Sequence, residues 1–394
     1  MHVYRTKDSE SIYDIAREYG VSPIKIAEDN ELEIRGRLPA GREVLILTPS
    51  RTHNVKSKDT LGMIAERFKT SKEALLRLNP ELRGREKLYS GQLLTIRECT
   101  PSMGMISTNG YLYSGVPRDR LIFLMPYLSY VTVCSAVYKD GKIRNLFLSD
   151  DTVALIRSHG RAPILRIYFY ELPERERDND FANAAVILAK SGGFSGIALS
   201  SLNSLEGNGE RLSEFTLKLR RALLENDLIL FAEGEVERDC SYMEYADAGI
   251  LTYDKMHRKT PPSFDDGEKA HFSRFADEYE SARSFVELSS FAYSSGQYME
   301  KGEAMKIIDR KHAQIVYDDD KKLLTASYGR HKKRDMSLES LENTKAKLGL
   351  VSELGFMGVS FDIGRVCIPD LMATSSVFEI VGSPVMTPRI TQEM

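Results

Sequence analysis

Four carboxylates in the second half of the chain each follow a short apolar run with the length of a buried strand. If these runs are neighbouring parallel strands of one barrel, their ends meet at the same face and bring the side chains together. One carboxyl group could then donate a proton while another accepts one. Solvated charges at the rim of the fold are the alternative, and both remain open. The four residues are Glu233, Glu235, Asp254 and Asp362.

The composition is that of an ordinary globular protein. The 394 residues are 42% hydrophobic and 28% charged, with a formal net charge of −3 and a pI of about 6.2. These values exclude a mainly disordered chain, a collagen and a bundle of membrane helices. The near-neutral balance also argues against nucleic acid and a membrane surface as partners. The dense basic run at residues 330–334 is interpreted as a solvated loop.

The sequence predicts neither a metal nor a cofactor. Its four cysteines lie far apart, and its seven histidines show no metal-like spacing. The N-terminus has no apolar core of the kind found in a signal peptide, so we expect no secretory signal. No stretch of about 18 apolar residues is present to span a membrane. No feature predicts an oligomeric state.

Short apolar runs alternate with amphipathic stretches from residue 103 to residue 394, which is typical of a parallel sheet covered by helices. Such β/α units over about 290 residues predict an α/β fold, a (β/α)₈ TIM barrel. Residues from about 297 to 334 are additional to the β/α units of the barrel and predict a small α+β insertion. The eight expected strands are Ile106–Tyr113, Tyr130–Ala136, Pro163–Tyr168, Gly196–Leu199, Leu228–Ala232, Ala248–Tyr253, Phe285–Leu288 and Gly358–Phe361.

Two copies of a repeat precede the barrel, at residues 1–48 and 52–97. The segment ESIYDIA of the first copy aligns with DTLGMIA of the second, and each copy continues to an asparagine, Asn30 or Asn79. In the second copy, Ser57 or Asp59 is expected to cap a first helix. Pro80 is expected to end a second helix, because proline lacks the N–H that a helix needs. Each copy is therefore predicted to be a small β-α-α-β module.

The second copy resembles a LysM domain in His53, Val55, the run Lys58-Asp59-Thr60-Leu61, Asn79-Pro80 and Gly91-Gln92. The resemblance implies binding of polymers of N-acetylglucosamine, such as peptidoglycan or chitin. The groove would lie between the start of the first helix and the loop after the second. The alternative is that these residues only cap and pack the module. The mapped residues are Asp59, Thr60, Leu61, Asn79, Pro80 and Leu82 in the second copy, and Glu10, Ser11, Ile12 and Asn30 in the first.

The barrel resembles family 18 glycoside hydrolases, above all the spore-associated branch with N-terminal LysM modules. The resemblance rests on Asn109-Gly110-Tyr111 and on residues 126–130, 193–197, 251–254 and 355–359. It implies a sugar pocket at the barrel mouth, in which Tyr253 and Asp254 contact the N-acetyl group. We place Asn109, Tyr111 and Tyr168 in the same pocket.

The catalytic motif of that family is degenerate in this chain. The family carries Asp-x-x-Asp-x-Asp-x-Glu at the end of the fourth strand, and the four positions here are Ser195, Ala198, Ser200 and Leu202. Leu202 cannot donate a proton, and losing a general acid typically removes about 10²–10⁴ of the rate. Glu206 is close to the lost acid in sequence, but the ungapped alignment places it in a loop.

The sequence therefore predicts a protein that binds cell-wall glycan through LysM modules and carries an inactive glycosidase-like barrel. An active N-acetylglucosaminidase-type hydrolase is one alternative, using displaced carboxylates such as Glu235, Asp254 or Asp362. A purely structural protein of a spore layer is another. Proteins of the resembling branch are deposited on the spore from the mother cell, so spore coat or cortex is the expected location, with the cytoplasm as the alternative.

Overall fold

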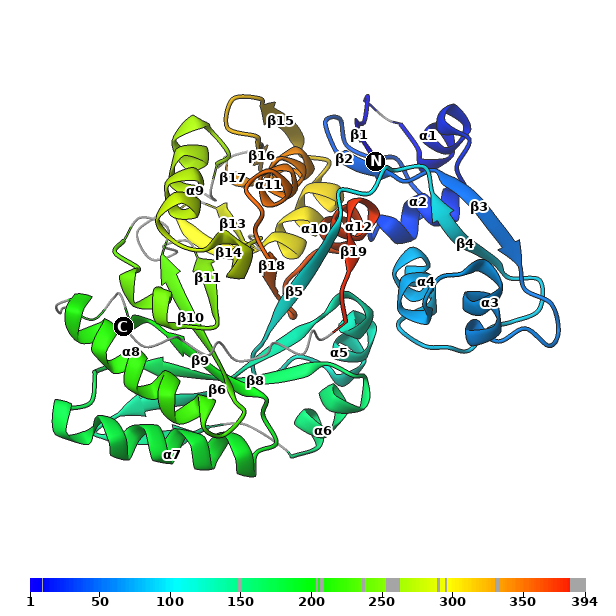
Figure 1. Cartoon of the computed structure of the whole chain (residues 1–394). Helices are drawn as coiled ribbons and strands as arrows, with labels where there is room; N and C mark the ends of the chain where they lie inside the picture. Colours follow the sequence, from blue (N-terminus) through cyan, green and yellow to red (C-terminus); the bar gives the residue numbers. More distant parts are fainter. Residues whose placement is uncertain are drawn as a thin grey trace.

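The computed structural model describes residues 1–8, 10–146, 150–202, 205, 209–235, 238–252, 263–288, 291–294, 296–329 and 334–382. Two small modules lie at one side of a barrel, and a third small unit lies above it (Figure 1). In the part of the chain that is described, no helix is long and apolar enough to cross a membrane.

Each repeat folds as the predicted β-α-α-β module, with its own buried core. Helix α1 begins after Ser11, whose side chain and that of Asp14 form a capping box. Helix α3 is capped by Thr60, whose hydroxyl accepts a hydrogen bond from Met63 N at 3.2 Å. The expectation of Ser57 or Asp59 as the cap was therefore wrong. The elements are β1 (His2–Arg5), α1 (Ile12–Tyr19), α2 (Pro23–Asp29) and β2 (Glu43–Ile46), then β3 (Pro49–Asn54), α3 (Leu61–Phe68), α4 (Lys72–Leu78), η1 (Pro80–Leu82) and β4 (Leu93–Glu98).

The large domain is a closed barrel of eight parallel strands, as predicted. Its strands follow one another in chain order, and the pairing of β5 with both β6 and β18 closes the sheet. A short hairpin strand, β7 (Lys142–Asn145), extends β6, and β19 (Glu379–Ile380) pairs with the start of β5. The barrel strands are β5 (Met105–Leu112), β6 (Tyr130–Lys139), β8 (Ala162–Phe169), β9 (Gly196–Ser200), β10 (Ile229–Glu235), β11 (Ala248–Thr252), β12 (Ser284–Glu287) and β18 (Gly358–Asp362).

Helices cover the outside of the barrel, and a large hydrophobic core fills the space between them and the strands. A second, smaller core lies inside the barrel, where alternate residues such as Tyr130, Ile164, Ala198 and Phe231 meet. The longer helices are α5 (Arg118–Leu124), α6 (Asp150–Ser158), α7 (Asp178–Ser191), α8 (Gly209–Leu224), α9 (Asp266–Glu278), α11 (Leu341–Glu353) and α12 (Ile368–Val377).

The insertion is larger than the expected range of about 297–334. It contains an antiparallel sheet of five strands in the order β14-β13-β17-β16-β15, with its own core against α10. Ser337, just beyond the expected end of the insertion, lies in β17 and pairs with Tyr293 and Thr325. The elements are β13 (Phe291–Ser294), β14 (Gln297–Glu300), α10 (Lys301–Lys311), β15 (Gln314–Asp318), β16 (Leu323–Tyr328) and β17 (Arg334–Glu339).

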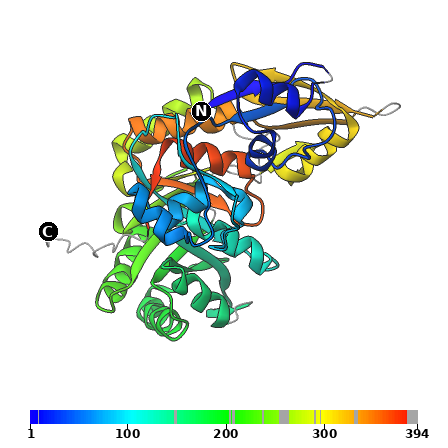
Figure 2. The same cartoon turned by 90° about the vertical axis from the view of Figure 1, so that its right-hand side faces the viewer.

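The first repeat packs against this insertion, as the view in Figure 2 shows (dark blue beside yellow and orange). Arg42 Nε donates to Asp309 Oδ1 of α10 at 3.0 Å. The Arg5 guanidinium lies 3.4 Å from the centre of the Tyr317 ring on β15. The first module and the insertion are therefore in direct contact.

Candidate functional site

The barrel mouth holds a buried ion pair close to the place where the catalytic motif was expected. Along β8, Ile164 faces the barrel interior, so Arg166 and Tyr168 point the same way nearer the mouth. Arg166 Nε and Nη2 donate to the two carboxylate oxygens of Glu233, on β10, at 2.6 and 2.8 Å. Burial alone would lower the pKa of Arg166, but the charge of Glu233 outweighs burial and the pKa lies above its usual range.

Ser200 completes this cluster and ties it to the motif. Its hydroxyl, at the third motif position, donates to Glu233 Oε2 at 2.6 Å, and both residues are buried. The carboxylate of Glu233 therefore already accepts three hydrogen bonds, two of them from a cation. In this arrangement Glu233 acts as an acceptor that holds Arg166 and Ser200 in place.

The other motif positions also lack an acid. Ser195 precedes β9, and Ala198 packs in the core inside the barrel. Leu202 is fully buried in the outer core, against the helices, because the chain turns at Ser201, whose φ is +68°. Glu206, Tyr253 and Asp254 lie outside the described residues.

The remaining rim carboxylates are bound to neighbours. Glu235 pairs with Arg238 at 2.6 Å. Asp362 accepts a hydrogen bond from Gly364 N at 2.8 Å and lies 3.6 Å from Arg365 Nε.

Tyrosines surround the ion pair. The Arg166 guanidinium lies 5.6 Å from the ring centre of Tyr111 and 6.0 Å from that of Tyr168. Tyr168 is half-exposed, whereas Tyr111 is buried. Burial, and then the charge of Glu233, hold the pKa of Tyr111 well above its usual range, so its hydroxyl keeps its proton. The mouth is thus lined by aromatic rings in a chain that contains no tryptophan.

Three buried polar atoms below the rim have no hydrogen-bond partner among the described residues. They are Asn109 Nδ2, Tyr111 Oη and Ser360 Oγ, on the adjacent strands β5 and β18. The other end of the Asn109 amide is satisfied, because Thr132 Oγ1 donates to Asn109 Oδ1 at 2.7 Å. A buried polar atom without a partner is uncommon, and a bound polar ligand or water is one way to satisfy it.

In the second repeat, the residues mapped to a glycan groove make hydrogen bonds within the module, cap its helix or pack in its core. Asp59 Oδ2 lies 2.7 Å from His53 Nε2 and accepts from Lys56 N at 3.0 Å. These bonds, first that of His53, lower the pKa of Asp59 to about 2. Thr60 caps α3, and Leu61, Pro80 and Leu82 are buried.

The same roles recur in the first repeat. Glu10 accepts from Tyr4 Oη at 2.8 Å, Ser11 caps α1, and Ile12 is buried in the module core. Asn30 Nδ2 donates to Ile26 O and Leu45 O at 2.9 and 2.8 Å, and Asn30 Oδ1 accepts from Leu45 N at 2.7 Å.

Asn79 of the second repeat makes the same three bonds, to Leu75 O, Thr95 O and Thr95 N. Both N–H groups and the oxygen of each asparagine side chain are therefore engaged within their module. At the mapped positions, a glycan would therefore contact backbone groups and exposed neighbouring residues.

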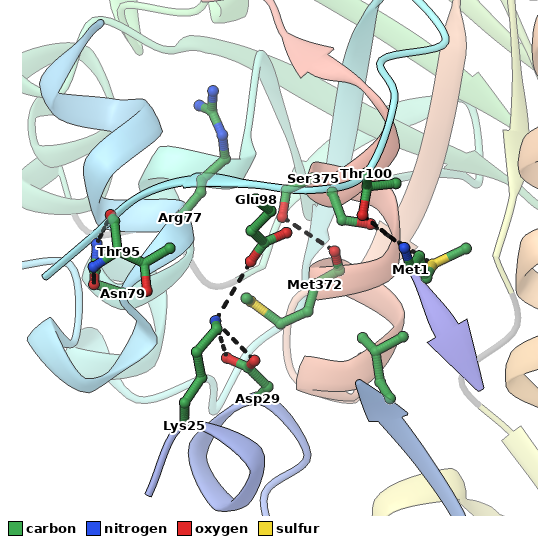
Figure 3. A network of polar contacts seen from close by, with 12 residues as sticks. Met1, Lys25, Asp29, Arg77, Asn79, Thr95, Glu98, Thr100, Met372 and Ser375 are labelled. Carbon is green, nitrogen blue, oxygen red and sulfur yellow. Dashed lines mark hydrogen bonds and ion pairs between the residues drawn. The ribbon is translucent and has the colours of Figure 1, made fainter. Parts of the chain in front are cut away.

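A buried network of polar contacts joins the two modules to each other (Figure 3), and a separate bond of Arg77 joins the second module to the barrel. Lys25 on α2 lies 2.8 Å from Asp29 Oδ2 and 3.4 Å from Glu98 Oε1 on β4. Burial raises the pKa of Asp29 to about 7, although Lys25 acts in the opposite direction. Arg77 on α4 donates to Pro126 O at 2.9 Å and accepts, through its carbonyl, from Tyr127 Oη.

The loops after both second helices face the barrel. Glu31 accepts from Ile368 N at 3.1 Å. At Gly84, a Cβ would lie 2.5 Å from the carbonyl oxygen of Ile122. One wall of each mapped groove therefore lies at the junction with the barrel.

Sequence reasoning missed Arg166 and Glu287. Arg166 sits inside an apolar run that reads as an ordinary strand, and its partner lies 67 residues away. Glu287 is a buried carboxylate at the end of β12. It follows a short apolar run, which is the same signal that identified Glu233. In the described part of the chain, no group of three metal-ligating side chains was found.

Comparison with known proteins agrees with this architecture. Residues 4–46 and 53–97 match the LysM domain family. The N-terminal region is a pair of LysM domains. An endolysin of Bacillus phage B103 is 45% identical over 47 residues, which are 12% of this chain. The match spans only 18% of the endolysin's own length.

Solved structures share the fold of the whole chain. The spore cortex-lytic enzyme SleL of Bacillus megaterium QM B1551 superposes with a TM-score of 0.73 at 16% identity, covering 96% of this chain and 98% of SleL. SleL of Bacillus cereus gives 0.72 at 16% identity, over 97% and 99% of the two chains. A chitinase of Chromobacterium violaceum gives 0.62 at 17% identity, over 69% and 98%.

Proposed function

We propose that this chain binds an N-acetylglucosamine-containing cell-wall glycan, peptidoglycan or a chitin-like polymer, and does not cleave it. The LysM domains, proposed at residues 1–48 and 52–97, hold the glycan near the residues mapped above. The barrel, residues 103–394, serves as a rigid support with tyrosine rings at its mouth. The match of both repeats to LysM domains supports the binding half of this proposal.

One observation carries the claim that the barrel is inactive. The buried carboxylate nearest to the expected motif, Glu233, is fully engaged by Arg166 and Ser200. A general acid must present a proton to the glycosidic oxygen, and a group committed to accepting three hydrogen bonds is poorly arranged for that role. The position of the family's catalytic glutamate is occupied by Leu202, which packs away from the mouth.

Hydrolysis by displaced carboxylates is the second candidate. It is favoured by the likeness in fold to spore cortex-lytic enzymes over nearly the whole chain and by Glu287 at the barrel mouth. Glu235, Asp254 and Asp362 are the other acids it could use. The same likeness supports a location in the spore cortex or coat.

Co-sedimentation of the full chain with insoluble peptidoglycan, chitin and cellulose tests the binding half. We expect the protein to pellet with peptidoglycan or chitin and to stay in solution with cellulose, which lacks N-acetyl groups. Equal amounts in all three pellets, or none in any, would contradict the proposal. The variant Arg144→Gln, at an exposed pair on the barrel's β7 hairpin, should pellet like the wild type.

A further inference from the structure

The turn before the last strand differs between the two LysM domains in what covers it. In the first domain this turn packs on the insertion: Ile315 N donates to Ala40 O at 3.4 Å, and a Cβ on Gly41 would lie 2.5 Å from Ile315 O. In the second domain a Cβ on the equivalent Gly91 would meet nothing within 4 Å. Tyr89 in that turn is 63% exposed. The turn is closed in one copy and open in the other.

The open turn lies beside the loop that leads into α3. Gly91 N donates to Val55 O at 2.8 Å, and Val55 N donates to Gln92 O at 2.9 Å. These two bonds hold the start of the loop, at Lys56 and Lys58, next to the turn that carries Lys87 and Tyr89. We call these four residues the basic rim.

The basic rim is rich in uncompensated positive charge. Lys56, Lys58 and Lys87 are all exposed, and none makes an ion pair in the part of the chain that is described. Lys87 Nζ lies 5.2 Å from the centre of the Tyr89 ring. The nearest carboxylate of the loop, Asp59, is turned inward toward His53, and its side chain is 5% exposed.

The second LysM domain as a whole also carries an excess of positive charge. Residues 52–97 contain ten Lys and Arg against five Asp and Glu, whereas residues 1–48 contain seven against nine. The second domain is therefore strongly basic within a chain whose net charge is −3. Pro39 stands in the first domain where Tyr89 stands in the second, so the first domain lacks the exposed ring as well.

We infer that the second LysM domain is the one whose turn before the last strand is open to a glycan, and that its basic rim selects a carboxylate-bearing amino-sugar polymer over a neutral one. The inference rests on the proposed glycan binding and adds the class of glycan. Peptidoglycan carries carboxylates on its peptides and on those lactyl groups that bear no peptide, and chitin carries none. The three ammonium groups attract those carboxylates, while the Tyr89 ring offers a flat face to a sugar.

The test uses the full chain and soluble glycans. Wild type is compared with the triple variant Lys56→Gln, Lys58→Gln, Lys87→Gln, and with a control triple variant Lys142→Gln, Lys190→Gln, Lys311→Gln on the barrel and insertion. Affinities are measured by calorimetry for teichoic-acid-free peptidoglycan fragments, for the same fragments with amidated carboxyl groups, and for chitohexaose, each at low and high salt.

Exposed ion pairs contribute little individually, so we expect the rim variant to lose about three- to tenfold in affinity for peptidoglycan. The affinity of the wild type should fall by a similar factor on amidation or at high salt. Chitohexaose binding should not change in either variant. Equal loss in the control variant, or equal affinity of the wild type for all three glycans, would overturn this inference while leaving glycan binding standing. Absence of binding to every glycan would overturn both.

Discussion

The substitution Glu233→Gln tests whether the carboxylate at the barrel mouth is structural. Glu233 is 5% exposed and shares two short hydrogen bonds with Arg166, whose side chain is 16% exposed. Removing one partner of a buried ion pair leaves the other charge uncompensated and typically costs about 3–5 kcal/mol. Because Arg166 retains some contact with solvent, we expect the free energy of unfolding to fall by about 3 kcal/mol.

Urea unfolding followed by far-ultraviolet circular dichroism measures this loss in a chain without tryptophan. Glu235→Gln is the matched control, because Glu235 forms a similar pair with Arg238 at the more exposed rim and should cost about 1 kcal/mol or less. The double variant Arg166→Met, Glu233→Met should recover most of the stability, since neither charge of this pair remains buried. A loss below about 1 kcal/mol for Glu233→Gln would refute the reasoning and make Glu233 available for catalysis.

Three further predictions concern the LysM domains. Asn79→Ala removes three hydrogen bonds to the backbone and should lower the stability by about 2–3 kcal/mol in urea unfolding, whereas Ser90→Ala in the exposed turn should not. Asp29→Asn should flatten the pH dependence of stability. The raised pKa of Asp29 means that its contribution is present below about pH 4 and is lost as the pH rises through about 7, by up to about 1.4 kcal/mol per pH unit. A Tm series from pH 4 to pH 8 checks this, and an unchanged slope would contradict it. Gly84→Ala should lower the Tm by more than Gly91→Ala, because both residues have positive φ but only Gly84 abuts the barrel.

Much of the fold is predictable from local patterns. All eight barrel strands were placed within a few residues, because apolar runs of strand length alternate with helical stretches throughout residues 103–394. The insertion was underestimated at both ends. Strand β13 is only four residues long, and β17 begins with two charged residues, so neither carries a strong local signal. Ser337 adopts the strand conformation because it pairs with Tyr293 and Thr325, which are distant in sequence.

The site was harder to predict because its central contact is tertiary. The sequence shows that Leu202 replaces the catalytic acid of the family. It does not show the ion pair that occupies the barrel mouth. Arg166 lies between Leu165 and Ile167, and nothing local distinguishes it from a solvent-facing residue of an edge strand. Arg166 lies inside because the sheet closes into a barrel. In that barrel, β8 is two strands away from β10, which carries Glu233.

Incubation of the full chain with purified peptidoglycan, followed by mass spectrometry of the soluble fraction, tests the central claim most directly. The proposal of binding without cleavage predicts protein on the pellet and no new soluble saccharide, even at micromolar protein and after prolonged incubation. Soluble fragments with new N-acetylglucosamine reducing ends, absent with the Glu287→Gln variant, would contradict it and identify the barrel as a hydrolase.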